Sequence, residues 1–262
     1  MSGSHGALLL LPTLLGETPP ERVLPAETIE VARKTTIFLA EDARSGRAFL
    51  KAIAHPRPVA SLTVIEIGHA PDRRYYDEWL APPRDGLDVA LLSAAGGPAV
   101  ADPGSGVVAR AHQLGVRVRP LVGPSSLLLA LMAAGMSGQR FRFVGYLPQD
   151  REALVGAIAA LERASRGAET QLFIETPYRN ERLLQALLEH ARSDTQLAVA
   201  VDLTTDAEHV LSLPISDWRT LPQASRPVLA RRPAVFALMA APEVQPARGS
   251  ARRGRTSRSG RQ

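Results

Sequence analysis

The sequence predicts an α/β protein with two α/β domains, the first built on a mainly parallel sheet and the second on a mixed sheet. In residues 7–135, apolar runs of strand length alternate with helical patterns, as in parallel β–α units. Segments 195–203 and 208–214 follow one another without a helix, so we expect them to pair antiparallel. The expected domains cover residues 1–123 and 124–241, and a basic tail follows over 242–262.

The first domain is expected to hold five strands, each a short apolar run. They cover residues 7–12, 36–41, 61–67, 87–93 and 115–121. Helical patterns follow over 25–35, 43–53, 72–82, 103–114 and, with an apolar surface, 124–135. Asp102 is expected to cap the helix that begins at Pro103, because proline at the first helical position loses no hydrogen bond.

The second domain is expected to combine two long helices with five strands. The helices cover 150–165, with Asp150 as the capping residue, and 180–192. The strands cover 140–148, 170–176, 195–203, 208–214 and 234–240.

Composition excludes several classes of protein. The chain has no cysteine, so disulfides, thiolate zinc sites and a cysteine nucleophile are excluded. The six histidines are scattered singly, and no metal site is expected. No apolar run reaches the roughly 20 residues of a membrane span. The apolar start lacks a preceding basic residue and is interrupted by Pro12, which favours a buried strand over a signal peptide. We therefore expect a cytoplasmic location.

The positive charge is concentrated at the C-terminus. Residues 244–262 hold six arginines and no acid, so removing them lowers the net charge of +5 to −1. A segment with so few apolar residues is expected to be disordered. Two interpretations stay open: electrostatic contact with RNA or another polyanion, and a solvated extension without a role.

Three loops follow strands of the expected parallel sheet: 12–18, 93–102 and 122–126. Ligands of such sheets bind at the carboxyl ends of the strands, so the loops indicate a cleft, although ordinary helix capping explains each loop alone. The second loop has roughly nine residues, against the usual two to six or so. The phosphate motifs G-x-x-x-x-G-K-[ST] and G-x-G-x-x-G are absent. The small, neutral loops suit a nucleoside that carries an amino-acid tail.

Six segments occur in a distinctive order: LLPTLLGET, AEDARSGRAFL, ALLSAAGGPAVADPGSGVV, VRPLVGPSSLLLALMAAG, FVGYLP and LFIETPYRN. In this order they resemble the tetrapyrrole methylase superfamily, most of all its branch of ribosomal RNA small subunit methyltransferase I. The resemblance covers about residues 7–240. It implies two domains with S-adenosylmethionine (SAM) between them, a homodimer, and methyl transfer to ribosomal RNA at a ribose 2′-oxygen.

The resemblance also implies the residues of the site. Glu41, Asp42 and Glu175 are the candidate catalytic bases, and Arg44 and Arg179 are the candidate cations, although each acid–arginine pair can instead hold loops together. The expected cofactor-binding residues are Pro12, Ser93, Ala95, Gly96, Gly97, Pro98, Gly123, Pro124, Ser125, Ser126 and Thr176. His69 follows the third strand and could face the same cleft.

The chain departs from the family pattern at four places. Ala94 stands where the family has an acid, Gly97 where it commonly has a hydroxyl residue, and Ala43 where it has threonine. A Lys-Gly-Glu segment before the last strand is replaced by residues around Arg232. Three functions therefore stay open: methylation of RNA, methylation of a small tetrapyrrole-like molecule, and SAM binding without catalysis.

Overall fold

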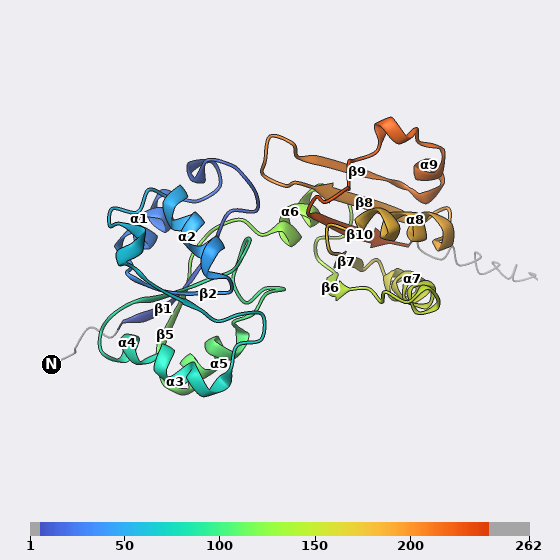
Figure 1. Ribbon diagram of the computed structural model, residues 1–262. Coiled ribbons are helices and arrows are strands. Elements are labelled where there is room, and N and C mark those ends of the chain that lie inside the picture. The colour runs from blue at the N-terminus through green and yellow to red at the C-terminus, as the bar shows by residue number, and fades with distance from the viewer. Residues whose placement is uncertain (1–5, 241–262) are drawn as a thin grey trace, which may run out of the picture.

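A computed structural model describes residues 6–240 of the chain, which form two five-stranded sheets. Figure 1 shows the two sheets side by side, with helices packed around them. The expected tail lies outside the described residues. The fold class predicted from the sequence, one parallel sheet followed by one mixed sheet, is confirmed.

The first sheet is entirely parallel and has the strand order β3-β2-β4-β1-β5. Its strands are β1 (Ala7–Leu11), β2 (Ile37–Ala40), β3 (Thr63–Glu66), β4 (Val89–Leu92) and β5 (Arg117–Pro120). Because all five strands run the same way, the loops that follow them gather at one edge.

Helices cover both faces of this sheet, and this explains why its central strands are apolar throughout. Leu9 packs beneath α1 (Ala26–Lys34) and α2 (Ala43–Ala52), whereas its neighbour Leu8 packs on the opposite face. The helices of that opposite face are α3 (Tyr76–Trp79), α4 (Ala81–Arg84) and α5 (Ser105–Gln113).

The prediction of a single helix over residues 72–82 is wrong. A 3₁₀ turn over Arg73–Tyr75 leads into the short α3, and α4 starts separately after Leu80. Pro82 and Pro83 explain the break, because neither has an N–H group to continue the hydrogen-bonding ladder of α3.

The second sheet has the order β6-β7-β10-β8-β9, in which only β6 and β7 are parallel. The antiparallel pairing expected for 195–203 and 208–214 is confirmed. The strands of this second sheet are β6 (Phe141–Tyr146), β7 (Thr170–Ile174), β8 (Gln196–Val201), β9 (His209–Pro214) and β10 (Ala234–Met239).

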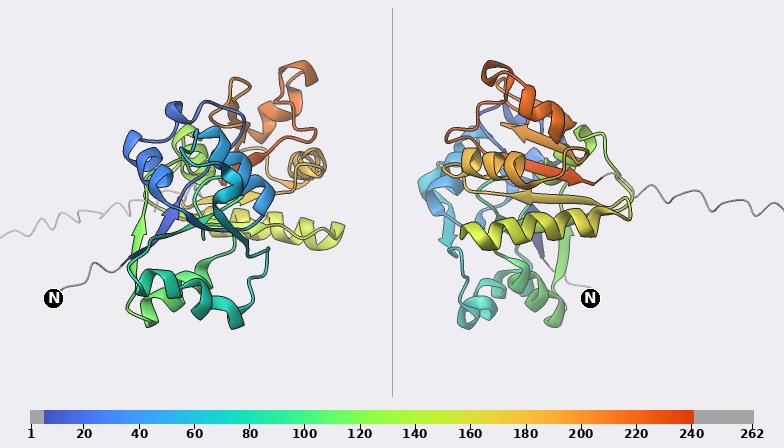
Figure 2. Two further views of the ribbon diagram at one scale, coloured as in Figure 1. Left: turned by 60° about the vertical axis from the view of Figure 1, so that its left-hand side comes forward. Right: turned by 90° about the vertical axis from the view of Figure 1, so that its right-hand side faces the viewer.

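Three helices form the outer layer of the second sheet: α7 (Arg151–Ser165), α8 (Asn180–His190) and α9 (Ile215–Thr220), of which the short α9 was not expected. Figure 2 shows α7 running along this layer. The inner face packs against α6 (Ser126–Ala133), which lies between the two sheets in Figure 1. Asp150 caps α7 as expected, since its carboxylate accepts the Ala153 N–H at 2.9 Å. No helix within residues 6–240 is long and apolar enough to cross a membrane.

Trp218 on α9 anchors this outer layer. Its side chain is fully buried, and its Nε1–H donates to the Leu197 carbonyl of β8 at 2.8 Å. Trp218→Phe removes that hydrogen bond and leaves a small void, so we expect a loss of about 1–2 kcal/mol of unfolding free energy. Urea unfolding measures the loss, and a midpoint equal to that of the wild type would contradict this role.

Candidate functional site

The loops after β1 and β4 are bonded to each other at the carboxyl edge of the first sheet. The Thr13 N–H donates to the Gly96 carbonyl at 2.9 Å, and the Thr13 hydroxyl donates to the Ser93 carbonyl at 3.3 Å. The Ser93 hydroxyl also donates to Gly96, at 2.8 Å. Gly96 has a φ of 76°, which favours glycine. Gly97 does not adopt a positive φ, but it borders open space.

The expected cap at Asp102 is wrong. Helix α5 begins at Ser105, and its N-cap is Gly104, which has a φ of 123°. A Cβ on Gly104 would lie 2.7 Å from Leu91 Cδ2, so only glycine fits where the chain enters the helix. Pro103 is therefore not the first helical residue. Asp102 stays in the loop, where its carboxylate is not used by the helix.

The loop after β5 packs closely on the loop after β1. A Cβ on Gly123 would lie 2.5 Å from the Cβ of Pro12 and 3.1 Å from Leu24 Cδ2. Helix α6 begins at Ser126, two residues later than the start expected at Pro124, and the Ser125 side chain makes no capping hydrogen bond.

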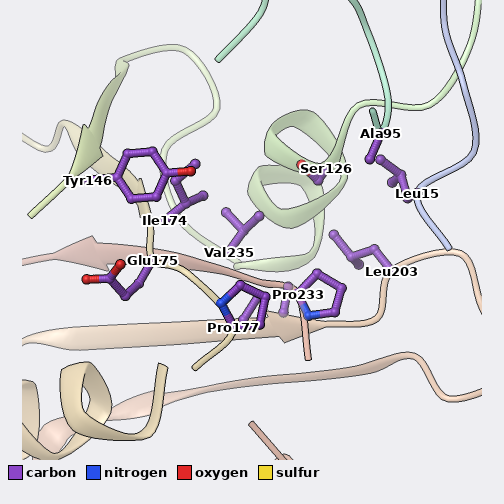
Figure 3. Close-up of a pocket in the computed structure, with 12 residues that line it drawn as sticks. Leu15, Ala95, Ser126, Tyr146, Ile174, Glu175, Pro177, Leu203, Pro233 and Val235 are labelled. Carbon is purple, nitrogen blue, oxygen red and sulfur yellow. The ribbon is translucent and has the colours of Figure 1, made fainter. Parts of the chain in front are cut away.

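A cavity of about 250 Å³ lies where these loops meet the second sheet (Figure 3). The loops contribute Leu15 and Ala95, and α6 contributes Ser126. The second half contributes Tyr146, Ile174, Glu175, Pro177, Ala200, Leu203, Pro233, Ala234 and Val235.

A second cavity of about 130 Å³ adjoins the first. Both are lined by Ala95, Ser126, Tyr146 and Ile174, and the second extends along the loop after β4 as far as Asp102. We call the two cavities together the cleft. It has a mainly apolar end in the second half and a polar end beside Asp102.

The expected cofactor-binding residues divide into two groups. Ala95, Gly96, Gly97, Ser125 and Ser126 line the cleft directly. The others do not line it: Pro12, Ser93, Pro98, Gly123, Pro124 and Thr176. Among the residues that sequence reasoning missed are Leu15, Tyr146, Leu203 and Pro233. They carry no motif, and only the packing of the two halves brings them together.

Glu175 and Arg179 form a pair in the turn between β7 and α8. Glu175 Oε1 lies 2.6 Å from Arg179 Nη2 and also accepts the Thr176 N–H at 2.6 Å. The Glu175 side chain borders the cleft although it is nearly buried (Figure 3). Arg232 belongs to a similar arrangement, because it pairs with Asp202 while its carbonyl accepts from Asn180 Nδ2. Both pairs hold the loops that form this wall of the cleft.

Asp42 caps α2. Its carboxylate accepts the Ser45 N–H at 2.6 Å, and this hydrogen bond holds the pKa of Asp42 below its ordinary value. Arg44, in the first turn of the same helix, is exposed. The N-terminus of α2 thus presents the Arg44 guanidinium to solvent, while the Asp42 carboxylate caps the helix.

Glu41 joins three strand ends of the first sheet. Its side chain is only 7% exposed; Oε1 lies 2.5 Å from His69 Nδ1, and Oε2 accepts the Ala94 N–H at 3.3 Å. Asp102 completes the cluster. Burial and, next, the negative charge of Glu41 raise the pKa of Asp102 to about 6, against smaller opposing effects of the Ser93 hydroxyl and His69.

The raised pKa of Asp102 makes stability depend on pH. Between about pH 4 and about pH 6 the folded chain holds a proton that the unfolded chain has lost, so Asp102 lowers stability as pH rises through this window. Asp102→Asn removes the buried charge. We expect it to stabilise the protein by about 1 kcal/mol at neutral pH, allowing for solvent screening, and hardly at all below about pH 4. Urea unfolding at the two pH values tests this, and an equal difference at both would contradict it.

Comparison with known protein families shows which family the chain belongs to. A sequence profile described as Tetrapyrrole (Corrin/Porphyrin) Methylases matches residues 22–218. The chain belongs to the tetrapyrrole methylase family. The resemblance inferred from the six segments is thereby confirmed, and the family is one of methylases by name.

Three relatives of known sequence carry the same name. Ribosomal RNA small subunit methyltransferase I of Micromonospora olivasterospora is 35% identical over 206 residues, which cover 79% of this chain and 62% of that protein. The protein of that name from Vibrio cholerae is 34% identical over 135 residues, covering 52% and 46%. The one from Pseudomonas aeruginosa is 28% identical over 218 residues, covering 82% and 73%. The chain thus matches less than two thirds of the first two relatives.

Several solved structures with this fold are methyltransferases by their titles. Cobalt precorrin-4 methyltransferase CbiF has a TM-score of 0.60 and 16% identity, with 91% of this chain and 97% of that one covered. The methyltransferase CobJ has a TM-score of 0.59 and 19% identity, covering 90% and 95%. A uroporphyrin-III C-methyltransferase from Thermus thermophilus, solved with S-adenosylhomocysteine, has a TM-score of 0.53 and 17% identity, covering 89% and 97%. At these identities the likeness shows the fold.

Proposed function

We propose that this protein transfers a methyl group from SAM to ribosomal RNA, at a ribose 2′-oxygen. The observation that carries the proposal is the cleft, which combines the small-residue loops of the first sheet with an apolar wall from the second. The shared name of the relatives supports RNA as the acceptor. The proposal takes residues 1–123 and 124–241 as the two domains, and a cytoplasmic homodimer as the working form.

The chemistry of the cleft fits SAM. Leu203, Pro233 and Val235 offer an apolar surface for a purine ring, and Glu175 lies beside them for a hydroxyl or an ammonium group. At the other side, the first-turn N–H groups of α6 receive no side-chain cap, so they can donate to a carboxylate. Gly97 leaves the loop backbone open to a ligand.

The remaining expected cofactor residues would act indirectly. The Ser93 hydroxyl holds the carbonyl of Gly96, and Pro12 holds the Gly123 backbone, so they keep the cofactor loops in place. We assign Pro98, Pro124 and Thr176 the same supporting role, because each adjoins a residue that lines the cleft.

SAM would supply a methyl group already activated on a positive sulfur. The residues of the chain would then align the acceptor with that group, and alignment provides much of the rate of such a transfer. A ribose hydroxyl loses its proton reluctantly, so a base beside the cleft assists. We assign the role of this base to Glu41 and its cluster with His69 and Asp102. The exposed Arg44 would contact the RNA backbone, whereas Asp42 and the Glu175–Arg179 pair would hold the loops.

A second candidate is methylation of a small tetrapyrrole-like molecule. The charge pattern favours it, because the chain without residues 244–262 has a net charge of −1, unlike the basic faces that bind RNA. SAM binding without catalysis is the third candidate, and the alanine at position 94 motivates it. A contribution of the basic tail to RNA binding belongs to the first proposal.

One labelling experiment separates the three candidates. The protein is incubated with methyl-labelled SAM and a bacterial extract, either intact or treated with ribonuclease, and the RNA and small-molecule fractions are counted. Label in small-subunit ribosomal RNA, as a ribose 2′-O-methyl group, is the expected result. Label in a small molecule after ribonuclease treatment would support the second candidate, and bound SAM without any label would support the third.

A further inference from the structure

The turn after β3 brings His69 back to the end of β2. Ile67 N–H donates to the Ala40 carbonyl at 2.9 Å and Gly68 N–H to the Glu41 carbonyl at 3.1 Å, so the chain stays paired beyond the strand. Gly68 then adopts a φ of 67°, a conformation that favours glycine. This turn places the ring of His69 against the Glu41 carboxylate, with Nδ1 2.5 Å from Oε1.

The contact fixes which nitrogen of the neutral ring carries the proton. A carboxylate only accepts hydrogen bonds, so Nδ1 of His69 must be the donor to Glu41. Nε2 then keeps its lone pair. Within residues 6–240 Nε2 has no hydrogen-bond partner, and the His69 side chain is 90% exposed. The ring therefore presents a proton acceptor to solvent close to Asp102, which lines the polar end of the cleft, although His69 and Glu41 do not line the cleft themselves.

Charge around the ring suits this task. Glu41 is nearly buried and has its other oxygen on the Ala94 N–H, so it is held in place behind the ring. Asp102, from the loop after β4, interacts electrostatically with both Glu41 and His69. The acids nearby on the adjoining elements are Asp42, which caps α2, and Glu66, which accepts the Ala43 N–H at 3.1 Å. The carboxylates of Glu41 and Asp102 thus stabilise the positive charge that the ring acquires when it takes a proton.

We infer that His69 is the proton acceptor of the methyl transfer, and that Glu41 is its positioning residue. The inference rests on the proposed function and replaces Glu41 by His69 as the group that touches the acceptor hydroxyl. In the reaction the O–H bond of the acceptor breaks and its proton goes to Nε2 of His69. The oxygen bonds to the methyl carbon as the carbon–sulfur bond breaks, and the electron pair of that bond stays on sulfur. The exposed ring then releases the proton to water.

The kinetic test compares His69→Gln with His112→Gln, a matched change at an exposed histidine of α5. We expect His69→Gln to lower kcat about 100-fold, with an unchanged affinity for SAM, and His112→Gln to change neither. The acid limb of the pH profile identifies the group. The pKa of Asp102 is itself raised to about 6, so the profile is measured in Asp102→Asn, where the acid limb should persist, and in the double variant with His69→Gln, where it should disappear.

Nuclear magnetic resonance of the imidazole nitrogens gives a test that needs no turnover. The His69 ring, assigned from the His69→Gln spectrum, should show the Nδ1–H form in the neutral state, and Glu41→Ala should abolish that preference. An Nε2–H form in the wild type, or a His69→Gln variant with unchanged kcat and acid limb, would overturn the inference while leaving the proposed function intact. A wild type that methylates nothing would instead refute the proposed function.

Discussion

Ala95→Phe strongly weakens SAM binding while the protein stays folded. Ala95 lines both cavities of the cleft, and its side chain is exposed rather than part of a core. A phenyl ring at this position occupies space that the ligand needs, and no neighbouring core has to move to admit it. We expect the dissociation constant for SAM to rise by about 100-fold or more, which isothermal titration calorimetry measures.

The matched control for this change is Ala160→Phe, at an exposed position of α7 away from the cleft. It adds the same ring and should leave both SAM affinity and melting temperature as they are. If Ala95→Phe bound SAM as tightly as this control does, the ligand would lie elsewhere, and the assignment of the cleft would be wrong.

Glu41→Gln lowers the rate of methyl transfer by about 100-fold to about 1,000-fold, with little change in SAM affinity. The amide keeps the shape of the side chain but has no charge, so it cannot stabilise a protonated His69. It also removes the negative charge that helps to raise the pKa of Asp102. Single-turnover rates at saturating SAM isolate this effect from binding.

Glu30→Gln provides the comparison, because Glu30 lies on the exposed surface of α1 and pairs with Lys34. It should not alter the rate. A Glu41→Gln variant as fast as Glu30→Gln would show that the cluster of Glu41, His69 and Asp102 has no part in the chemistry.

The fold could be predicted because its signal is local. Adjacent residues such as Leu8 and Leu9 enter cores on opposite faces of one sheet, which makes the strand apolar throughout and recognisable from its sequence. The alternation of such strands with helices then determines a parallel sheet. Where prediction failed, at 72–82, two prolines divide a helical pattern into short pieces.

The site could be predicted only in part, because much of its geometry depends on contacts distant in sequence. The loop glycines and serines indicated a cleft, but its apolar wall comes from strand ends of the second sheet, such as Val235, that carry no motif. Asp102 resembles a helix cap in the sequence, but Gly104, with its φ of 123°, is the N-cap and the helix begins at Ser105, which the sequence alone does not reveal. The contact of His69 with Glu41 likewise depends on the pairing of β3 with β2.

A calorimetric titration of the wild-type chain with SAM tests the central claim most directly, because every role assigned above depends on SAM in this cleft. We expect one binding site for each chain, with a dissociation constant in the range of about 1 µM to about 100 µM, and competition by S-adenosylhomocysteine. A folded protein that shows no binding at about 1 mM SAM would rule out SAM as the ligand of this cleft.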